Sequence, residues 1–545
     1  MTKTKLLKLP IGIQTFEKLR EDGYLYVDKT KYLIDLIDSG SVYFLSRPRR
    51  FGKSLMISTF DALFSGMREL FKGLRAEEFF DRPEYKTYPV IRLDMSSITT
   101  NKGNDELHAS MLLQINENAR RLAVDIEYIA PGDAFYSLMK RTAEKHEAPA
   151  VVLVDEYDSP MLKFLHRPER AQEVREILHD FYIRIKSADA SLHFVFITGI
   201  SKFSKVGVFS ALNSLEDISM DMPYSTMLGY TEAELLSYFD GYIDELAAEM
   251  QEDKEELIRR IQNYYDGFSF DGKNRLYNPF STLNFFKKKV FGNYWFESGT
   301  PSALVEYVKR HDLEVENFRG LEVPENFASI AEIERASPAS FLFQSGYLSV
   351  RERRGKKLLL DYPNMEVLSS VAELFLWEKA EASETGTASV DLEEFLAQGN
   401  AEGFVKIYNA LLASIPYDLY EREETKYALA QEQAKTAIKT VHHAESFYHA
   451  LLFTLLWSSR VNTVAENHGY WGRSDVEAEK NGHRYVIELK VADGEAAAKK
   501  AAVEAMQQIR EKGYADKYAA EGATLIAVAV DREKRRVAEY IIERL

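Results

Sequence analysis

The sequence contains no cysteine among its 545 residues. Disulfide bonds are therefore excluded, as are zinc and iron–sulfur sites that depend on cysteine ligands. The sequence also lacks the run of about 18 or more apolar residues that indicates a membrane-spanning helix. Its longest apolar stretches, such as residues 450–457, cover about two helical turns. The first ten residues lack the apolar core of a signal peptide, so we expect a protein of the reducing cytoplasm.

Positive charge is in deficit, because 69 lysines and arginines face 85 aspartates and glutamates and give a formal net charge of −16. An acidic chain does not attract nucleic acid through its mean field. Any contact with DNA or RNA must therefore come from a local basic surface. Carboxylates also chelate the metal ions of many nucleases, so the acidic balance lowers the expectation of nucleic-acid binding without removing it.

Short apolar runs alternate with helical segments in the first 215 residues. The runs are Val42–Leu45, Val90–Leu93, Val151–Val154 and Phe194–Thr198. Continuous apolar strands separated by helices predict a parallel sheet that helices cover on both faces. We expect four regions: an α/β core over 1–215, a helical lid over 216–290, a mostly helical linker over 291–435, and a second α/β domain over 436–545.

A basic loop follows the first of these runs. Residues 46–54 read Ser-Arg-Pro-Arg-Arg-Phe-Gly-Lys-Ser. A loop that ends in Gly52-Lys53-Ser54 between a strand and a helix predicts a phosphate-binding (Walker A) loop, in which main-chain N–H groups cradle phosphates. Lys53 would reach the β- and γ-phosphates, and Ser54 would hold Mg²⁺. The general pattern has glycine where this chain has Arg47, and the alternative is a basic turn before a helix.

Two carboxylates end the apolar run over residues 151–154. Asp155 and Glu156 would lie at the carboxyl edge of the sheet, where open α/β folds bind ligands. Asp155 would hold Mg²⁺ and Glu156 would orient and deprotonate the attacking water. The alternative is an ordinary capped strand end. Thr198, at the end of the next strand, would either touch the γ-phosphate or the attacking water, or merely satisfy its strand end.

The arginines of the basic loop have two alternative roles. Arginine suits bidentate contact with phosphate, but Arg47, Arg49 and Arg50 could equally anchor acidic residues of a neighbouring segment. The full nucleotide-binding set that we expect is Arg49, Arg50, Phe51, Gly52, Lys53, Ser54, Asp155 and Thr198.

The last 110 residues predict an α-β-β-β-α-β order with a hairpin turn at Asn481-Gly482. Asp475 precedes the turn, and Glu488 and Lys490 follow it two residues apart, on one face of a strand. Two carboxylates and a lysine are typical of a metal-dependent phosphodiesterase, in which the carboxylates bind Mg²⁺ or Mn²⁺ and the lysine supports the nucleophile or the transition-state charge. Glu445 is a further candidate ligand. The alternative is an amphipathic hairpin with solvated charges.

Both halves of the chain resemble known families. The N-terminal part resembles the AAA-ATPase-like domain of bacterial proteins in Tyr26–Thr30, Arg47–Ser54, Val154–Asp158 and Tyr277–Pro279. In that family the loop also reads Arg-Pro-Arg-Arg-Phe-Gly-Lys-Ser, so arginine in place of glycine is a trait of the family. The C-terminal part is similar to a PD-(D/E)XK nuclease domain that is often fused to it, in residues 445–449, 472–475 and 488–490.

The resemblance implies a P-loop NTPase with a helical lid and linker, followed by a restriction-endonuclease-like α/β domain. It implies ATPase and nuclease activities that use ATP and Mg²⁺, with Mn²⁺ as an option at the nuclease site. The metal ligands would be Ser54 and Asp155 in the first site, and Glu445, Asp475 and Glu488 in the second.

We expect ATP to gate the cleavage of nucleic acid, DNA rather than RNA, in defence or mobile-element biology. The alternative is an ATP-driven regulatory switch whose C-terminal domain binds a partner or nucleic acid without cutting it. The acidic net charge favours the switch, whereas the intact set of Asp475, Glu488 and Lys490 favours cleavage. No membrane partner is expected, and a homo-oligomer is left open.

Overall fold

The computed structural model describes most of the chain as two compact units. Met1–Glu306 with Gly320–Glu366 form the first unit, and Tyr307–Arg319 with Val367–Leu545 form the second. The described residues are 6–100, 103–127, 130–164, 167–202, 208–209, 212–298, 318–328, 337–380, 385–415, 440–469, 472–513, 518 and 522–545.

Five parallel strands form the main sheet of the first unit, in the order β2-β3-β4-β1-β5. Their bounds are β1 Val42–Ser46, β2 Val90–Asp94, β3 Ala150–Asp155, β4 Leu192–Gly199 and β5 Glu216–Asp217. The first four coincide with the apolar runs that predict strands, and every residue of β3 is buried. β5 has only two residues, which are polar, so no apolar run predicts it.

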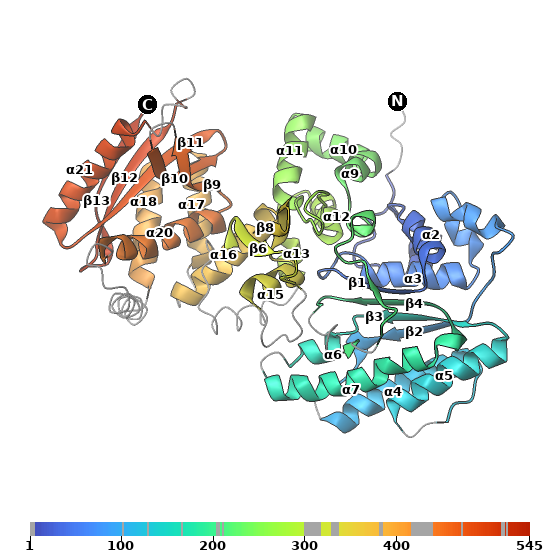
Figure 1. The fold of residues 1–545 in the computed structure, drawn as a ribbon. Coiled ribbons are helices and arrows are strands. Elements are labelled where there is room, and N and C mark those ends of the chain that lie inside the picture. Colours follow the sequence, from blue (N-terminus) through green and yellow to red (C-terminus); the bar gives the residue numbers. More distant parts are fainter. Residues whose placement is uncertain are drawn as a thin grey trace. The chain divides into compact units, whose positions relative to one another are not determined.

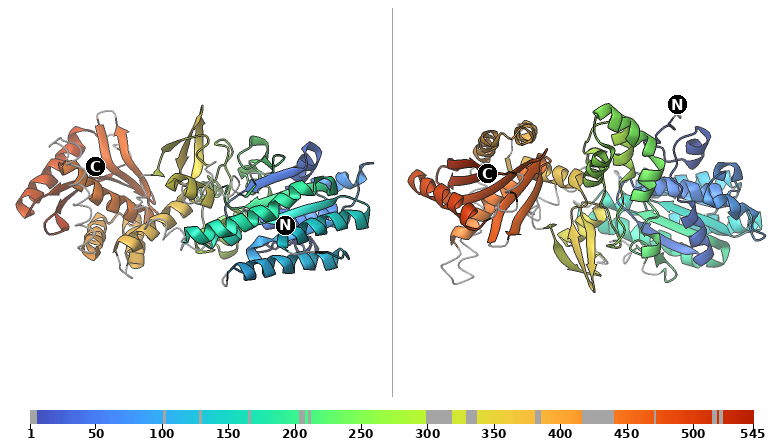
Figure 2. Two further views of the ribbon diagram at one scale, coloured as in Figure 1. Left: turned by 60° about the horizontal axis from the view of Figure 1, so that its bottom comes forward. Right: turned by 90° about the horizontal axis from the view of Figure 1, so that it is seen from above.

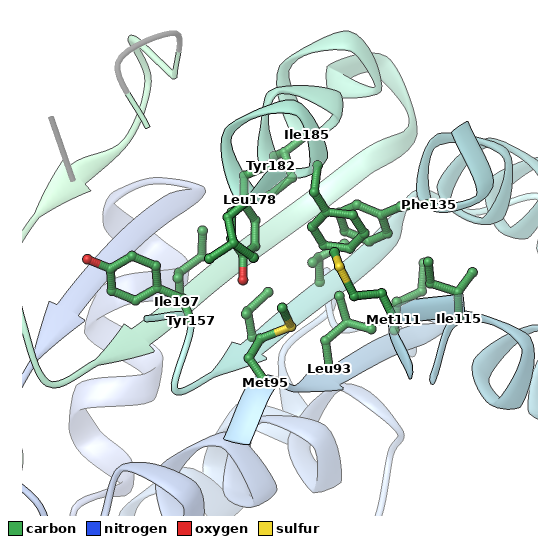
Figure 3. Packing of buried hydrophobic residues seen from close by; sticks show 14 of the residues in the cluster. Leu93, Met95, Met111, Ile115, Phe135, Tyr157, Leu178, Tyr182, Ile185 and Ile197 are labelled. Atoms are coloured by element: carbon green, nitrogen blue, oxygen red, sulfur yellow. The ribbon is translucent and has the colours of Figure 1, made fainter. Parts of the chain in front are cut away.

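Helices cover both faces of this sheet, as the sequence predicts. They are α1 Phe16–Glu21, α2 Thr30–Ser39, α3 Lys53–Phe64, α4 Asn104–Arg121, α5 Pro131–His146, α6 Ser159–Leu162 and α7 Pro168–Ser187. Figure 1 shows α3 on one face and α4, α5 and α7 on the other. The main core lies beneath α4, α5 and α7, where Leu93 and Ile197 of the sheet meet Met111, Phe135 and Leu178 (Figure 3). Short 3₁₀ turns span Arg68–Phe71, Arg75–Asp81, Met95–Ser97, Asp189–Ser191 and Met222–Tyr224.

Four helices lie within residues 216–290, where the sequence predicts a helical lid, and we call them the lid. They are α9 Glu232–Tyr238, α10 Asp240–Met250, α11 Lys254–Tyr265 and α12 Pro279–Lys288. Side chains cap the starts of three of them: Thr231 and Glu234 form a capping box before α9, Asp253 caps α11, and Asn278 caps α12, which begins with a proline. Their apolar faces share one core with the N-terminal segment that includes Leu25.

Within residues 291–435, which the sequence predicts to be mostly helical, residues 321–324, 349–354 and 357–361 instead form an antiparallel sheet in the order β6-β8-β7. Its strands are β6 Leu321–Pro324, β7 Ser349–Arg354 and β8 Lys357–Asp361, and the helices of the region are α13 Tyr294–Ser298, α15 Pro338–Ser345, α16 Met365–Ala380, α17 Thr385–Ala397 and α18 Ala401–Ser414. The sequence did not predict β7 because four of its six residues are charged and exposed. Its arginines pair with carboxylates, as Arg351 does with Asp361 and Arg353 with Glu325.

The second unit contains a five-stranded sheet in the order β13-β12-β11-β10-β9. Its elements are α20 Thr440–Ser458, β9 Asn462–Gly469, β10 Gly472–Lys480, β11 His483–Ala492, α21 Glu495–Glu511, β12 Thr524–Asp531 and β13 Arg536–Arg544. β11 and β12 are parallel and the other pairs are antiparallel. The predicted α-β-β-β-α-β order is confirmed, and the last element is the strand β13.

The two faces of this sheet are covered by different helices. Val486 shares an apolar cluster with Ala505 and Met506 of α21. The next side chain on the other face belongs to Tyr485, whose Oη donates a hydrogen bond to Leu396 O of α17 at 2.7 Å. α21 therefore packs on one face of the sheet and α17 on the other, and both views in Figure 2 show this arrangement. Along β11, Glu488 and Lys490 lie two and four residues after Val486. Their side chains therefore share the face of the sheet on which α21 packs.

Among the described residues, no helix combines the length and the apolar character that crossing a membrane requires.

Candidate functional sites

Three neighbouring parallel strands end at one edge of the N-terminal sheet and bring the predicted nucleotide-binding residues together. β4 lies between β1 and β3, with Leu45 beside Thr198 and Val154 beside Ile197. The basic loop leaves β1 at this edge, and Asp155 ends β3 there. The carboxyl edge of parallel strands is where open α/β sheets bind ligands, so the topology makes this edge the candidate binding site.

Lys53 begins α3 and is held inside the basic loop. Its Nζ donates hydrogen bonds to Arg47 O and Pro48 O, both at 3.0 Å, and the residue is 4% exposed. Burial lowers the pKa of the ammonium, and the carboxylates of Glu156 and Asp155 oppose that shift. Gly52, just before Lys53, has a φ of +96°, and a Cβ placed there would meet nothing within 4 Å. Its backbone conformation therefore favours glycine, and the space beside the loop is open.

Arg47 belongs to the fold rather than to the open side of the loop. Its guanidinium donates to Ser219 O at 2.6 Å and to the more distant carbonyls of Tyr224 and Ser225 at 3.3 and 3.4 Å. It also lies 4.0 Å from the centroid of the Phe270 ring, and the residue is 1% exposed. Burial lowers the pKa of Arg47 to about 9, which still leaves the side chain charged at pH 7. Of the two roles open to the arginines, Arg47 therefore anchors a neighbouring segment, through hydrogen bonds to main-chain carbonyls and the electrostatic attraction of Asp217 and Asp271.

We expect Arg47→Met to destabilise the N-terminal unit. Methionine keeps an unbranched stem but leaves buried carbonyls without their donor, so the free energy of unfolding should fall by about 3 kcal/mol. Calorimetric melting measures the shift, and Arg49→Met, at an exposed position of the same loop, is the matched control. Equal melting temperatures for the two variants would contradict this structural role.

The rest of the loop divides between the fold and the open side. The ring of Phe51 packs against Phe268 and Phe270, with centroids 5.0 and 5.7 Å away. The side chain of Phe51 therefore belongs to the fold, and only its main chain remains a predicted contact of the nucleotide. Arg49 and Arg50 are exposed, and the guanidinium of Arg50 lies 4.8 Å from the centroid of the Phe280 ring in the lid.

Thr198 links the two carboxylate residues at the end of β3. Its Oγ1 donates to Asp155 Oδ1 at 2.7 Å and accepts a long bond, 3.4 Å, from the main-chain N–H of Glu156. Thr198 is fully buried and Asp155 is 4% exposed. Of the roles considered for Thr198, the structure favours the local one, in which its hydroxyl forms hydrogen bonds at the strand ends. These bonds also orient the carboxylate of Asp155.

Glu156 has a strained backbone and an electrostatically perturbed side chain. Its φ of +50° places a non-glycine residue in the left-handed region, a conformation that costs about 1–3 kcal/mol and clusters at functional sites. Burial raises the pKa of the Glu156 carboxyl, and the nearby Lys53 ammonium opposes that shift. Such a group retains a proton to higher pH than an ordinary glutamate and is suited to proton transfer.

A cavity of about 350 Å³ opens beside these residues. Lys53, Ser54 and Glu156 line its polar end together with Arg49, Arg50 and Gly52. Its remaining walls come from the N-terminal segment and the lid, and consist of Pro10, Gly12, Ile13, Gln14, Leu55, Tyr230, Pro279, Phe280 and Leu283. A polar end beside a mostly apolar wall is typical of a pocket for a small organic ligand.

The apolar walls are the part of the site that the sequence did not reveal. They come from residues 10–14 and 279–283, which lie far from the basic loop along the chain and carry no catalytic residue type. The signal that could have found them is Tyr277-Asn278-Pro279, a segment that the family resemblance includes and that starts α12 beside the cavity.

The C-terminal hairpin brings Glu488 and Lys490 together. Glu488 is fully buried, and Lys490 Nζ lies 3.5 Å from Glu488 Oε1, so the prediction that they share one strand face is confirmed. The turn also agrees with prediction, because Asn481 and Gly482 have φ values of +49° and +79° and Lys480 pairs with His483 across it.

Asp475 and Glu445 are described by their main chain only. Asp475 lies in β10 and Glu445 in α20, and both side chains lie outside the described part of the chain. The recorded pairing of β10 with β11 reaches Val476 and Ile487. One further antiparallel step would bring residue 475 opposite residue 488, which is the register that the predicted metal site requires.

Comparisons with known proteins agree with both halves of this picture. Residues 10–209 match the AAA-ATPase-like family, described as "Predicted AAA-ATPase", and residues 443–540 match the PD-(D/E)XK nuclease superfamily. The chain is also similar to a protein of Azotobacter chroococcum mcd 1 described as "Uncharacterized protein in vnfD 5'region", with 35% identity over 547 residues that cover 99% of each chain. The chain therefore belongs to the AAA-ATPase-like family and carries a C-terminal domain of the PD-(D/E)XK nuclease superfamily.

Proposed function

We propose that the N-terminal unit binds and hydrolyses ATP in the cavity at the carboxyl edge of its sheet. The observation that carries this proposal is the convergence of Lys53, Ser54 and Glu156 on one cavity, with Asp155 directly behind them. A bound Mg²⁺ would supply positive charge that neutralises the phosphates. Ser54 and Asp155 are the residues that would hold it, Lys53 would leave its loop carbonyls to pair with the β- and γ-phosphates, and the exposed Arg49 and Arg50 would contact phosphate oxygens.

The base of the nucleotide would lie against the apolar wall of the same cavity. Ile13 and Pro10 supply one side of this wall, and Phe280 and Leu283 of the lid supply the other. A purine buries a flat apolar surface between such walls. The lid and the N-terminal segment already share a core, so this wall is formed before a nucleotide binds.

Hydrolysis would depend on Glu156 as the general base. The expected result for Glu156→Gln is a loss of ATP turnover of about 10²- to 10⁴-fold, because the amide cannot accept the proton of the attacking water. ATP affinity should persist, since Lys53 and the loop are unchanged. Phosphate release and calorimetric titration with ATP separate the two effects, with the exposed Glu144→Gln as control. Normal turnover in Glu156→Gln would exclude this assignment.

We propose that the C-terminal domain cleaves phosphodiester bonds of nucleic acid, DNA in the first instance. Asp475 and Glu488, helped by Glu445, would hold Mg²⁺ or Mn²⁺, which activates water and stabilises the leaving oxygen. Lys490 would support the transition-state charge. The pairing of a fully buried Glu488 with Lys490 at 3.5 Å supports this proposal, because a solvated amphipathic hairpin has no reason to bury a carboxylate beside its lysine. In this proposal ATP gates the cleavage, in defence or mobile-element biology.

The competing proposal is an ATP-driven switch whose C-terminal domain binds a partner or nucleic acid without cutting it. The net charge of −16 favours it. Incubation of the wild-type protein with DNA or RNA, Mg²⁺ or Mn²⁺, and with or without ATP, tests the two. Absence of cleavage under all of these conditions would exclude the nuclease proposal and favour the switch.

A further inference from the structure

Two consecutive side chains after β3 grip the segment that follows β4. Tyr157 donates its main-chain N–H to Thr198 O and its Oη to Ser201 O, both at 2.9 Å. The carboxylate of Asp158 accepts hydrogen bonds at 2.7 Å from both the N–H and the Oγ of Ser201, and one at 3.2 Å from the N–H of Ile200. Both side chains are fully buried. We call these two residues and their contacts the Tyr157–Asp158 clamp.

Gly199 shows how closely the clamp presses on β4. A Cβ at this position would lie 2.4 Å from the ring carbons of Tyr157 and 2.8 Å from Asp158 Oδ1. Its φ is not in the left-handed region, so close approach rather than conformation requires glycine. The two segments are therefore fixed against each other by contact as well as by hydrogen bonds.

The clamp lies directly after Glu156, the residue with the strained backbone. A left-handed non-glycine residue persists only where its surroundings over-determine it. On one side of Glu156, Thr198 Oγ1 accepts its N–H and holds Asp155. On the other side, the clamp fixes the next two residues to the end of β4. Burial raises the pKa of Asp158, while its hydrogen bonds from Ser201 oppose that shift and favour the carboxylate as an acceptor.

We propose that Tyr157 and Asp158 are positioning residues for ATP hydrolysis, which hold the Glu156 carboxylate in the cavity by clamping the turn after β3 to the segment after β4. This inference rests on the proposed function, because it requires Glu156 to act on ATP. Neither residue lines the cavity. Their loss should therefore lower turnover and leave ATP affinity unchanged.

Two substitutions test the clamp. Asp158→Asn offers one acceptor oxygen and adds a donor that faces Ser201, while Tyr157→Phe removes a single hydroxyl and keeps the ring. We expect kcat to fall about tenfold or more in Asp158→Asn and about threefold in Tyr157→Phe, with the Kd for ATP within about twofold of wild type. Because Ser201 is the shared partner, Ser201→Ala should lower kcat by itself and add little to Asp158→Asn.

The matched control is Asp133→Asn, which changes a partly exposed aspartate that pairs with Arg184 at 2.9 Å in the same unit. Its kcat and Kd should equal those of wild type. If the wild type hydrolyses ATP and both clamp variants keep its kcat, or if they weaken ATP binding with kcat unchanged, the inference is overturned and the proposed function stands. If Asp158→Asn does not fold, Tyr157→Phe decides alone in the same way. A wild-type protein that hydrolyses no ATP overturns the proposed function and the inference with it.

Discussion

Lys53→Met is expected to abolish ATP hydrolysis, with a loss of kcat/KM of at least about 10³-fold. Lys53 is the cation that begins α3 at the polar end of the cavity, and in the proposed function its ammonium would pair with the β- and γ-phosphates. Methionine has a similar length and no charge. Phosphate release measures the loss of turnover, and calorimetric titration with ATP should show weaker binding as well.

The same substitution should change the melting temperature of the protein by only a few degrees in the absence of nucleotide. Two effects on the free energy of unfolding oppose each other. Removal of a buried ammonium, whose pKa burial lowers, stabilises the fold. Loss of the hydrogen-bond donor to Arg47 O and Pro48 O destabilises it by a similar amount, about 1–3 kcal/mol. Lys31→Met, at an exposed position on α2, is the control. If Lys53→Met hydrolyses ATP as wild type does, the basic loop is not the phosphate site.

Lys490→Met and Asp475→Asn should each lower nucleic-acid cleavage by about 10²- to 10⁴-fold and leave ATP hydrolysis unchanged. Lys490→Met removes the charge that would stabilise the transition state, and Asp475→Asn removes a carboxylate that would bind the metal. Cleavage of linear duplex DNA with Mg²⁺ or Mn²⁺, with and without ATP, measures the effect. Lys500→Met, at an 80% exposed lysine side chain of α21, is the matched control.

Comparing these variants with Lys53→Met separates the two proposed functions. If activity in cells requires Lys53, Asp475 and Lys490 alike, ATP-gated cleavage is supported. If it requires Lys53 and tolerates Asp475→Asn and Lys490→Met, the C-terminal domain serves the switch. Cleavage by wild type that persists in both nuclease variants would show that the hairpin is not the catalytic site.

Apolar continuity explains which elements of the fold were predictable. The strands β1, β3, β4 and β12 are buried along most of their length, so each appears in the sequence as a largely apolar run, and β2 is interrupted only by the half-buried Arg92. β5 depends on only two paired positions beside Tyr43 and Phe44, and β7 is held by cross-strand ion pairs. Neither of these interactions leaves an apolar pattern in the sequence.

The predictable part of the nucleotide site follows from topology. Parallel strands end at one edge, so residues that follow β1 and β3 can be expected to meet. The role of Arg47 was not predictable, because its partners are main-chain carbonyls of residues 219–225, and a carbonyl carries no sequence signal. The apolar walls of the cavity were missed for a related reason: tertiary packing alone brings residues 10–14 and 279–283 to the loop.

The anchoring of Arg47 limits how this loop can change in evolution. Exchange of Arg47 for glycine would restore the general phosphate-binding pattern, yet it would also remove the guanidinium that holds residues 219–225 and stacks on Phe270. Glycine could replace Arg47 only after the carbonyls of residues 219–225 had gained other hydrogen-bond donors. Loop and segment are therefore expected to vary together among descendants, and a search that demands glycine at this position will overlook them.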